Sequence, residues 1–492
     1  MKSILRATVI LSTGSIVSIL FGLASSKVLA VLIGPSGYGY WGLLQSLVGL
    51  SALIAVGIGA GLVREGANAL AHEDYMQVAS LRIGAWLLLG MLGGVGVFLM
   101  TIFRMPISRW MLGGTEHAWS VVLMGVALLF SLAAGLQDNT LNAYHRVEAL
   151  ARVSVVTAVF CSCISIATVW LLGLRGIVPA IIAGAAARCA VSRYFLRREV
   201  ALVAARPPRR KVFEAAKWLL LFNGPYTASM MVGGGVQLAL PVLVLHILGK
   251  EDVGFYKAAT LISLNYLGFL LTALGYDYYP RASAVRDKPH ALIHLINEQH
   301  RLIMLLAVPI ILGALALVPY VIPILYTRQF YPTAELLEWQ LIGDLFKLSS
   351  WTMSYVILAR SSSSTYFCIE LICGLTAFLT SWAGMRWFGL SGLGIAFIAT
   401  YIVYYLVVWF ILKRDIGLTW TAENKRIIFA AVAAAAAIRI LPSTPLASSR
   451  TAVALSLAAI VAARSLYVIW REAGVKAPAN AELTGKAQPE TY

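Results

Sequence analysis

Apolar segments of about twenty residues recur along this 492-residue chain, and they limit its fold more than any other feature. A helix needs about twenty apolar residues to cross a bilayer core, where a backbone satisfies its hydrogen bonds only as a helix or a closed barrel. We therefore predict an all-α integral membrane protein. Its approximately 14 transmembrane helices are expected at residues 8–33, 38–63, 81–103, 118–137, 153–174, 176–195, 216–247, 254–275, 301–323, 337–359, 365–385, 390–412, 426–441 and 451–470.

Composition excludes several other classes of protein. Charged residues make up 12% of the chain, about half of the 25% found in an average soluble domain. The net charge of +17 lies in short connections between apolar runs, which is not the continuous basic face of a nucleic-acid-binding domain. The connections are too short for a separate catalytic domain, so we predict no enzyme and no catalytic residues. The five cysteines lie in apolar stretches, where we expect small buried hydrophobic side chains.

The distribution of lysine and arginine predicts the orientation in the membrane. The connections at 193–217, 281–290 and 413–426 are rich in these residues, which marks cytoplasmic connections. The apolar N-terminal stretch is too long for a signal peptide, so we expect it to remain as the first span. With an even number of spans, both termini lie in the cytoplasm.

Two short stretches of the chain align without gaps. GPSGYGYW, which starts at Gly34, aligns with GKEDVGFY, which starts at Gly249, and Gly39 then aligns with Gly254. Each stretch ends one span and begins the next, and six spans separate the two, so both halves have the same orientation in the membrane. We predict two six-helix lobes related by a parallel repeat, with two further helices at the C-terminus.

The repeat and the composition together predict the domain boundaries. These are an N-terminal six-helix lobe at 1–195, a basic cytoplasmic linker at 196–215, a C-terminal six-helix lobe at 216–413, two additional helices at 414–470 and a disordered cytoplasmic tail at 471–492.

The first of the two repeated stretches, together with the residue that follows it, contains Gly37, Gly39 and Gly42, a G-x-G-x-x-G pattern. In a dinucleotide-binding fold this pattern joins a strand to a helix within a βαβ unit. Here it lies between two spans, so we interpret it as a turn between membrane helices. We predict neither a cofactor nor a metal site, since no His pair has the spacing of metal ligands.

Cationic residues within or beside the spans are candidate substrate-binding residues. A charge at mid-bilayer costs roughly 2.5–3.5 kcal/mol and usually faces a cavity. Lys27 lies late in the first span, where it either extends to the outer interface or faces a phosphate or sugar in a cavity. Arg64 and Arg281 close the second and eighth spans. They either anchor these spans in the membrane or attract a pyrophosphate head group to the inner mouth of a cavity.

Further ionisable residues are candidates for an intramembrane coupling site. Asp344 and Lys347 are three residues apart and share one helix face, so they form either a self-neutralised pair or a substrate or ion site. Glu370 is a third candidate, although we expect it to pair with Arg360 across a short loop.

The remaining polar residues of the spans have mainly structural interpretations. Arg188 and Lys257 lie near the interfaces, where we expect them to anchor their helices. The amides of Gln45 and Asn265 suit either sugar hydroxyls or hydrogen bonds between helices.

Proline and glycine interrupt the expected span at 216–247. Gly224, Pro225 and Pro241 flank three consecutive glycines at 233–235. These residue types weaken a helix and permit bending, so we predict a hinge here.

The stretch SSKVLAVLIGPSGYGYW, together with the span that follows it, resembles the N-terminal signature of bacterial oligosaccharide-lipid flippases. These are the O-antigen and polysaccharide exporters of the multidrug/oligosaccharidyl-lipid/polysaccharide superfamily. The matching features are Lys27, the GP-x-G-x-G turn at 34–39, and the charged pair Arg64–Glu65 after a glycine-rich span. The resemblance implies export of undecaprenyl-pyrophosphate-linked sugar units across the inner membrane by alternating access, without covalent change. It implies as partners the lipid-linked oligosaccharide, membrane lipids and a polysaccharide polymerase or export machinery. Many relatives have twelve spans, whereas we expect about 14 in this chain.

Two other functions are compatible with a multi-span chain. A cation-coupled multidrug exporter of the same superfamily would need an acidic coupling residue in the first six spans, which contain no Asp or Glu near their centres. A membrane-embedded polysaccharide polymerase or ligase would need a large outer loop with catalytic residues, whereas the outer loops here are short. The flippase is therefore the leading hypothesis.

Overall fold

The computed structural model describes residues 2–200, 206–360, 363–440 and 447–484, and every regular element in these residues is helical. The elements are α1 (Lys2–Ala71), α2 (Tyr75–Ile102), α3 (Arg104–Leu112), α4 (Ala118–Ala143), α5 (Val147–Leu172), η1 (Gly173–Gly176), α6 (Ile177–Glu199), α7 (Arg209–Ile247), α8 (Lys250–Ala284), α9 (Pro289–Leu325), η2 (Arg328–Phe330), α10 (Pro332–Arg360), α11 (Ser363–Ile416), α12 (Ala422–Ile440) and α13 (Ala447–Thr484).

The predicted all-α membrane fold is confirmed. Eight helical stretches of the described residues are long and apolar enough to cross a membrane. Three of them exceed 50 residues and hold two spans each, joined at Gly34, Gly173 and Gly389. Taken with α8, α10 and α12, the described chain has the fourteen expected long helices, and the short helix α3 is an addition.

The bends between spans repeat along the chain and give the internal repeat a structural basis. Gly34 and Gly249 both have positive φ, 64° and 116°, with ψ of −177° and −178°. A second pair lies outside the aligned stretches: Gly173 and Gly389 both have φ 58° and ψ −137°. Residues with a side chain rarely adopt these backbone conformations, whereas glycine does so at little cost. Equivalent bends at both places indicate that the two halves turn between their spans in the same way.

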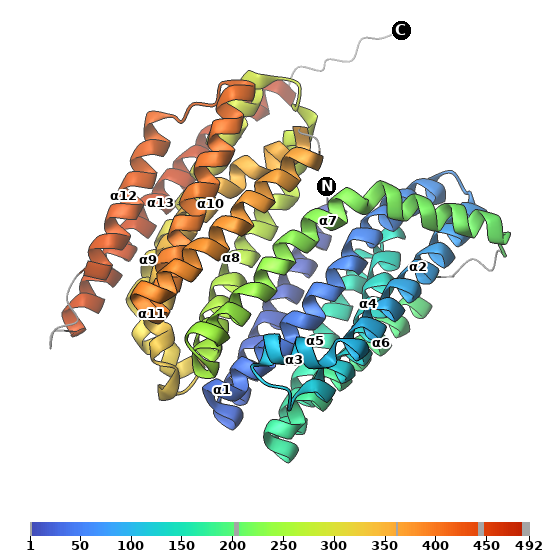
Figure 1. The fold of residues 1–492 in the computed structure, drawn as a ribbon. Coiled ribbons are helices and arrows are strands. Elements are labelled where there is room, and N and C mark those ends of the chain that lie inside the picture. The colour runs from blue at the N-terminus through green and yellow to red at the C-terminus, as the bar shows by residue number, and fades with distance from the viewer. Residues whose placement is uncertain (1, 201–205, 361–362, 441–446, 485–492) are drawn as a thin grey trace, which may run out of the picture.

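The two repeated turns contact each other directly. A Cβ atom at Gly39 would lie 2.6 Å from the Lys250 carbonyl oxygen and 2.9 Å from the Gly254 nitrogen, and one at Gly254 would collide with the Pro35 carbonyl. The backbones of α1 and α8 therefore approach closely only because both positions are glycine. This end of the bundle, which we call the turn end, is opposite the end that carries both termini (Figure 1).

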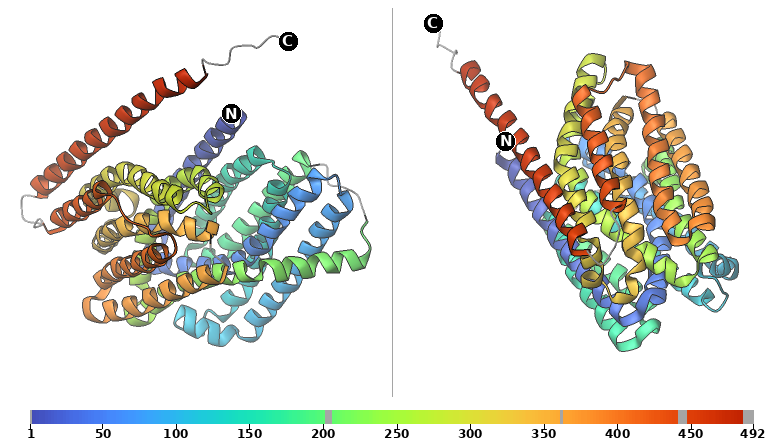
Figure 2. Two further views of the ribbon diagram at one scale, coloured as in Figure 1. Left: turned by 90° about the horizontal axis from the view of Figure 1, so that it is seen from above. Right: turned by 90° about the vertical axis from the view of Figure 1, so that its left-hand side faces the viewer.

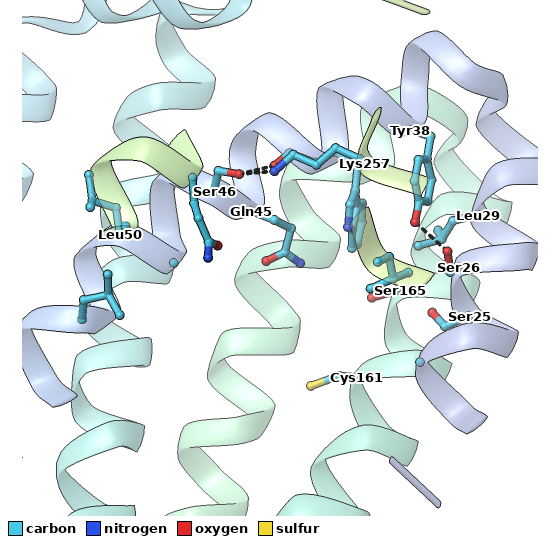
Figure 3. A pocket seen from close by; sticks show the side chains of 18 of the residues that line it. Ser25, Ser26, Leu29, Tyr38, Gln45, Ser46, Leu50, Cys161, Ser165 and Lys257 are labelled. Carbon is cyan, nitrogen blue, oxygen red and sulfur yellow. Dashed lines mark hydrogen bonds between the residues drawn. The ribbon is translucent and has the colours of Figure 1, made fainter. Parts of the chain in front are cut away.

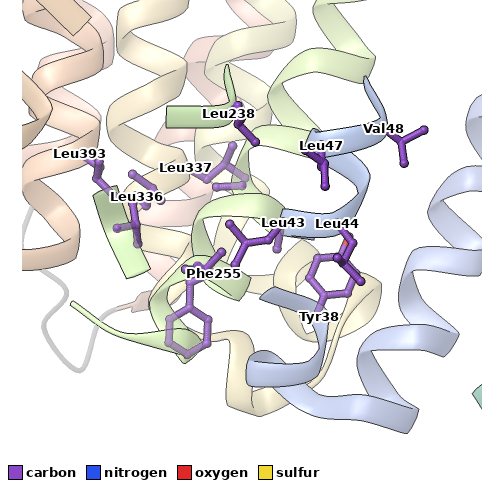
Figure 4. Close-up of a cluster of buried hydrophobic side chains, with 14 of the residues drawn as sticks. Tyr38, Leu43, Leu44, Leu47, Val48, Leu238, Phe255, Leu336, Leu337 and Leu393 are labelled. Atoms are coloured by element: carbon purple, nitrogen blue, oxygen red, sulfur yellow. The ribbon is translucent and has the colours of Figure 1, made fainter. Parts of the chain in front are cut away.

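Aromatic residues close the structure around this contact. Tyr38 of α1 lies edge-on to Tyr326 and Phe330, with ring centroids 5.8 and 5.7 Å apart, and Phe255 of α8 packs edge-on against Phe330 at 5.8 Å. Figure 4 shows Tyr38 in the same apolar cluster as Phe255 and the leucines of α1. The turn end is thus sealed by a packed core contributed by both halves.

Helix α7 connects the two groups of helices, α1–α6 and α8–α13, that lie side by side in Figure 1. It packs against α1 and α2 in the first group and against α11 in the second. Its first turns lie on α2, where a Cβ atom at Gly84 would be 2.9 Å from the Val212 carbonyl oxygen. A bend in α7 would therefore move one group relative to the other.

Some predicted boundaries differ from the helices observed. Helix α6 continues to Glu199 and α7 begins at Arg209, so the non-helical part of the linker predicted at 196–215 is shorter, and 201–205 lie outside the described residues. Helix α13 continues to Thr484 into the tail that we predicted to be disordered. This part of the tail holds Ala, Glu and Lys, which favour helix. Residues 485–492 lie outside the described chain.

The contact between the repeats predicts an asymmetric response to Ala substitutions within α8. We expect Gly254→Ala to destabilise the protein by about 1–3 kcal/mol, because the added methyl group overpacks the contact with α1. Gly268→Ala is the matched control, since a Cβ atom there would meet nothing within 4 Å. Thermal unfolding of the purified variants tests this, and equal melting temperatures would show that the close approach does not matter for stability.

Candidate functional site

A cavity of about 730 Å³ lies between the two halves of the bundle (Figure 3). Helices α1, α5, α7, α8 and α11 contribute its walls. Its polar lining consists of hydroxyl, amide, thiol and charged side chains: Ser25, Ser26, Tyr38, Gln45, Ser46, Cys161, Ser162, Ser165, Gln237, Lys257 and Glu370.

Lys257 of α8 supplies the positive charge of this cavity. Its Nζ donates a hydrogen bond to Ser46 Oγ of α1 at 2.5 Å, as Figure 3 shows. The stem of the lysine lies on α1 at Gly42, where a Cβ atom would be 2.6 Å from Lys257 Cγ. Among the described residues, Lys257 has no carboxylate within 4.0 Å. The prediction that Lys257 is an interfacial anchor is wrong, because α1 and α8 enclose it.

Glu370 of α11 also lines the cavity. Its Oε1 accepts a hydrogen bond from the Tyr404 hydroxyl at 3.5 Å. The predicted pair with Arg360 does not form: Arg360 Nε donates to Asp415 at 2.7 Å instead. Asp415 lies at the far end of α11, which folds back beside the end of α10, whereas the helix turns Glu370 toward the cavity.

Lys27 lies outside this cavity, contrary to the expectation that it could face a phosphate there. Lys27 is exposed, while Ser25, Ser26 and Leu29 line the cavity. The reason is helical geometry: residues four apart share a face, and residues two apart lie on different sides of a helix. Lys27 therefore points away from the wall that its neighbours form.

Arg64 and Arg281 both lie near the end of the bundle that carries the termini. Their side chains are 67% and 46% exposed. Arg64 lies 3.8 Å from Glu65, and Arg281 donates to Glu298 at 3.3 Å. The structure does not bring them into the 730 Å³ cavity, so their role at an entrance stays a prediction.

Asp344 and Lys347 form a pair in the second half. Asp344 is fully buried and lies 3.9 Å from Lys347 Nζ, and Ser263 Oγ donates to the carboxylate at 3.1 Å. The ammonium group lies 5.5 Å from the ring centroid of Tyr401. Neither residue lines the cavity, and these contacts support the interpretation as an internally neutralised pair.

The amide and hinge candidates have different outcomes. Gln45 lines the cavity, whereas the side chain of Asn265 lies outside the described part of the structure. For Gly224 and Pro225 only the helical backbone is described, and α7 is one continuous helix through them and past Pro241, which is buried. A hinge in α7 therefore stays a prediction.

Two further expectations concern cysteines and metals. Cys163 and Cys368 are exposed rather than buried, because they lie on the outer faces of α5 and α11, where lipid replaces a protein core. The described residues contain no group of three or more His, Cys, Asp or Glu that could hold a metal ion.

The hydroxyl groups of the cavity were missed from the sequence. The cavity is lined by Ser25 and Ser26 of α1 and by Ser162 and Ser165 of α5, and the Ser26 hydroxyl lies 2.6 Å from that of Tyr38. A serine pair precedes Lys27, and this was the available signal, but serines are common between membrane helices. Together, one ammonium group, several hydroxyls and two amides can bind a polar anion that carries sugars.

The family model described as polysaccharide biosynthesis protein matches residues 28–335, more than half of the chain. The Lipid III flippase of Escherichia coli (strain K12) is 23% identical over 429 residues, which cover 82% of this chain and 96% of that protein. A putative O-antigen transporter of Shigella flexneri is 23% identical over 382 residues, covering 75% and 89%.

Solved membrane transporters share the fold. A Lipid II flippase MurJ structure in an inward closed conformation has a TM-score of 0.73 at 14% identity, covering 94% of this chain and 99% of that one. An inward-facing multidrug resistance MATE family transporter of the MOP superfamily has a TM-score of 0.63 at 16% identity, covering 85% and 99%.

The position of the cavity predicts which side chains meet water. In a variant whose five cysteines are replaced by serine, we expect Gln45→Cys to react with a charged thiol reagent, because the cavity admits water. Leu87→Cys in the middle of α2 should react little, although Leu87 is 43% exposed, because that surface faces lipid. Mass spectrometry of the labelled protein measures both rates, and equal labelling would contradict this assignment of the cavity.

Proposed function

The chain belongs to the polysaccharide biosynthesis protein family, and from this premise we propose that it moves a lipid-linked oligosaccharide across the bacterial inner membrane. The substrate class is a sugar repeat unit on undecaprenyl pyrophosphate. The protein changes which side of the membrane the head group faces and makes or breaks no covalent bond. The names of the two similar proteins, a Lipid III flippase and an O-antigen transporter, support this proposal.

The observation that carries the proposal is the ammonium group of Lys257 in a cavity between the two halves. A lone charge within a membrane is costly, and such residues face cavities or partners. Lys257 has a serine hydroxyl as its hydrogen-bond partner and so retains donors for an anion. A pyrophosphate would fulfil this need, and charge-assisted hydrogen bonds of this kind are among the stronger ones in proteins.

The other lining residues suit the rest of the head group. Serine hydroxyls and the amides of Gln45 and Gln237 can exchange hydrogen bonds with sugar hydroxyls. Gly233 of α7 keeps part of the wall free of a side chain, which leaves room for a bulky sugar. The polyprenyl tail would remain in the bilayer, where it is as well solvated as the helices.

The way in which the cavity is closed supports alternating access as the mechanism. The glycine contact between α1 and α8 and the aromatic cluster seal the turn end, so opening that end requires the two halves to separate there. Such a switch responds to a ligand only through a difference in affinity between its two states. Because α7 packs on both groups, we assign it the role of the connecting element that bends.

The orientation belongs to the same proposal. Lysine and arginine are concentrated in the connections at the end that carries the termini, which supports a cytoplasmic location for this end. Arg64 and Arg281 then lie at the cytoplasmic entrance, where they would attract the pyrophosphate. A polysaccharide polymerase or export machinery would receive the product on the other side.

One observation favours a second function, a cation-coupled multidrug exporter. Glu370 places a carboxylate in the cavity, and a carboxylate can bind an organic cation or a coupling ion. Replacing this residue separates the two functions. If the protein is such an exporter, the native chain should export a cationic dye and Glu370→Gln should abolish this export. If it is a flippase, the native chain should export no dye, and Glu370→Gln should still move the anionic lipid-linked substrate.

We expect Lys257→Gln to reduce flipping of a lipid-linked oligosaccharide at least ten-fold, because a hydrogen bond to a charged group contributes about 1.5–3 kcal/mol. The measurement uses proteoliposomes with a fluorescent undecaprenyl-pyrophosphate-linked sugar and follows its loss to an impermeant quencher. Lys27→Gln is the matched control, since it removes the same charge from a side chain outside the cavity. Unchanged flipping by Lys257→Gln, or equal losses in both variants, would contradict the proposal.

A further inference from the structure

A second cavity, of about 720 Å³, lies between α9, α12 and α13. Helices α12 and α13 follow the repeated part of the chain, and both pack on α9 rather than extensively on each other. Figure 2 shows α13 at the edge of the bundle. This cavity is therefore a groove on the outer surface, separate from the cavity between the halves.

The inner part of this groove is apolar. Its floor is α9, and small alanines on α12 leave space that larger side chains would fill. The apolar lining residues are Met304, Leu305, Val308, Leu312, Ala422, Ile427, Ala430, Ala431, Ala434, Val461 and Val468. Such a surface matches hydrocarbon chains.

One end of the groove is cationic. Arg426 of α12 and Arg464 of α13 both line it, and among the described residues neither has an ion-pair or hydrogen-bond partner. Arg439 of α12, by contrast, is paired and lies 3.1 Å from Glu335. The acidic residue of the groove, Glu423, is neutralised by Arg301 at 3.0 Å. The two free guanidinium groups thus give this end a net positive charge.

A hydroxyl group lies in the same groove. Ser465 lines the groove and is 4% exposed, and within the described chain its hydroxyl has no hydrogen-bond partner. A hydroxyl can donate one hydrogen bond. A ligand with an oxygen acceptor between Arg464 and Ser465 would accept hydrogen bonds from both side chains.

The arginines lie at the depth of lipid head groups. Arg426 is four residues from the start of α12 at Ala422, a distance of about 6 Å along the helix. Arg464 is seven residues before Arg471, where the apolar stretch of α13 ends, a distance of about 10 Å. Both lie toward the end of the bundle that carries the termini, and long arginine side chains extend to the interface from such positions.

From these observations we infer that the groove between α9, α12 and α13 holds an anionic glycerophospholipid. Its phosphate is bound by Arg426, Arg464 and Ser465, and its acyl chains cover the apolar floor on α9. Basic pockets between membrane helices on the cytoplasmic side suit such head groups. The lipid fills the space between α12 and α13, and so it stabilises their packing against the rest of the bundle.

The test compares lipid binding by full-length variants in native mass spectrometry, with cardiolipin and phosphatidylethanolamine as probes. We expect cardiolipin to remain bound to the native protein. In the double variant Arg426→Gln/Arg464→Gln, the fraction of protein with bound cardiolipin should fall at least five-fold. The matched control is Arg414→Gln/Lys425→Gln, which removes the same charge from exposed residues outside the groove.

A pocket-filling variant tests the apolar part independently of charge. Ala430→Phe should also reduce bound cardiolipin, because Ala430 lines the groove, whereas Ala433→Phe on the same helix should not, because Ala433 is exposed outside it. Cardiolipin should raise the melting temperature of the native protein by more than phosphatidylethanolamine does, and Arg426→Gln/Arg464→Gln should remove this difference.

Three outcomes would overturn the inference. The first two are equal losses in both double variants and equal retention of the zwitterionic lipid. The third comes from the same experiment with undecaprenyl phosphate as an additional probe: the Arg426→Gln/Arg464→Gln variant loses this lipid and retains cardiolipin. The last result would assign the groove to the tail of the transported lipid. Lys257→Gln should bind cardiolipin normally, so failure of this inference and failure of the proposed function give different results.

Discussion

The cost of a charge in hydrocarbon decides where the functional groups of this protein lie. A single charged side chain at mid-bilayer costs several kcal/mol unless a cavity or a partner receives it. Asp344 and Lys347 meet this constraint by pairing inside the second half, whereas Lys257 meets it by facing a cavity with a serine as its partner. The paired residues are neutral as a unit, whereas the charge of Lys257 can be neutralised by an anionic ligand.

Glycine gives this arrangement its geometry. Gly39 and Gly254 allow the backbones of the two repeats to meet, and Gly42, one turn further along α1, provides the space in which the stem of Lys257 lies. The glycine-rich turn therefore does more than reverse the chain. It seals one end of the bundle and places the cation of the second repeat against the first repeat, which brings the cavity to the boundary between the two halves.

The sequence predicted the features that depend on the bilayer and on local backbone conformation. Span length fixes the number of helices, and the Gly34–Gly249 alignment indicates the repeat because such turns need glycine. The direction in which an individual side chain points, toward the interior or toward lipid, could not be predicted in the same way. In a soluble helix the polar face marks the solvent, but both the interior and the lipid-facing surface of a membrane helix are apolar. Nothing in the sequence of α1 distinguishes the direction of the Lys27 side chain from that of the Ser26 side chain. The position of the Lys257 ammonium group depends on packing between segments that are more than 200 residues apart in the sequence.

The central claim is that the ammonium group of Lys257 binds the anionic head group of a lipid-linked sugar within the cavity between the halves. A structure determined with an undecaprenyl-pyrophosphate-linked oligosaccharide tests it most directly. The account predicts density for the pyrophosphate within hydrogen-bond distance of Lys257 Nζ, with the sugars beside the serines of α1 and α5. A head group bound at Lys27 on the outer face of α1, with the cavity unoccupied, would contradict it.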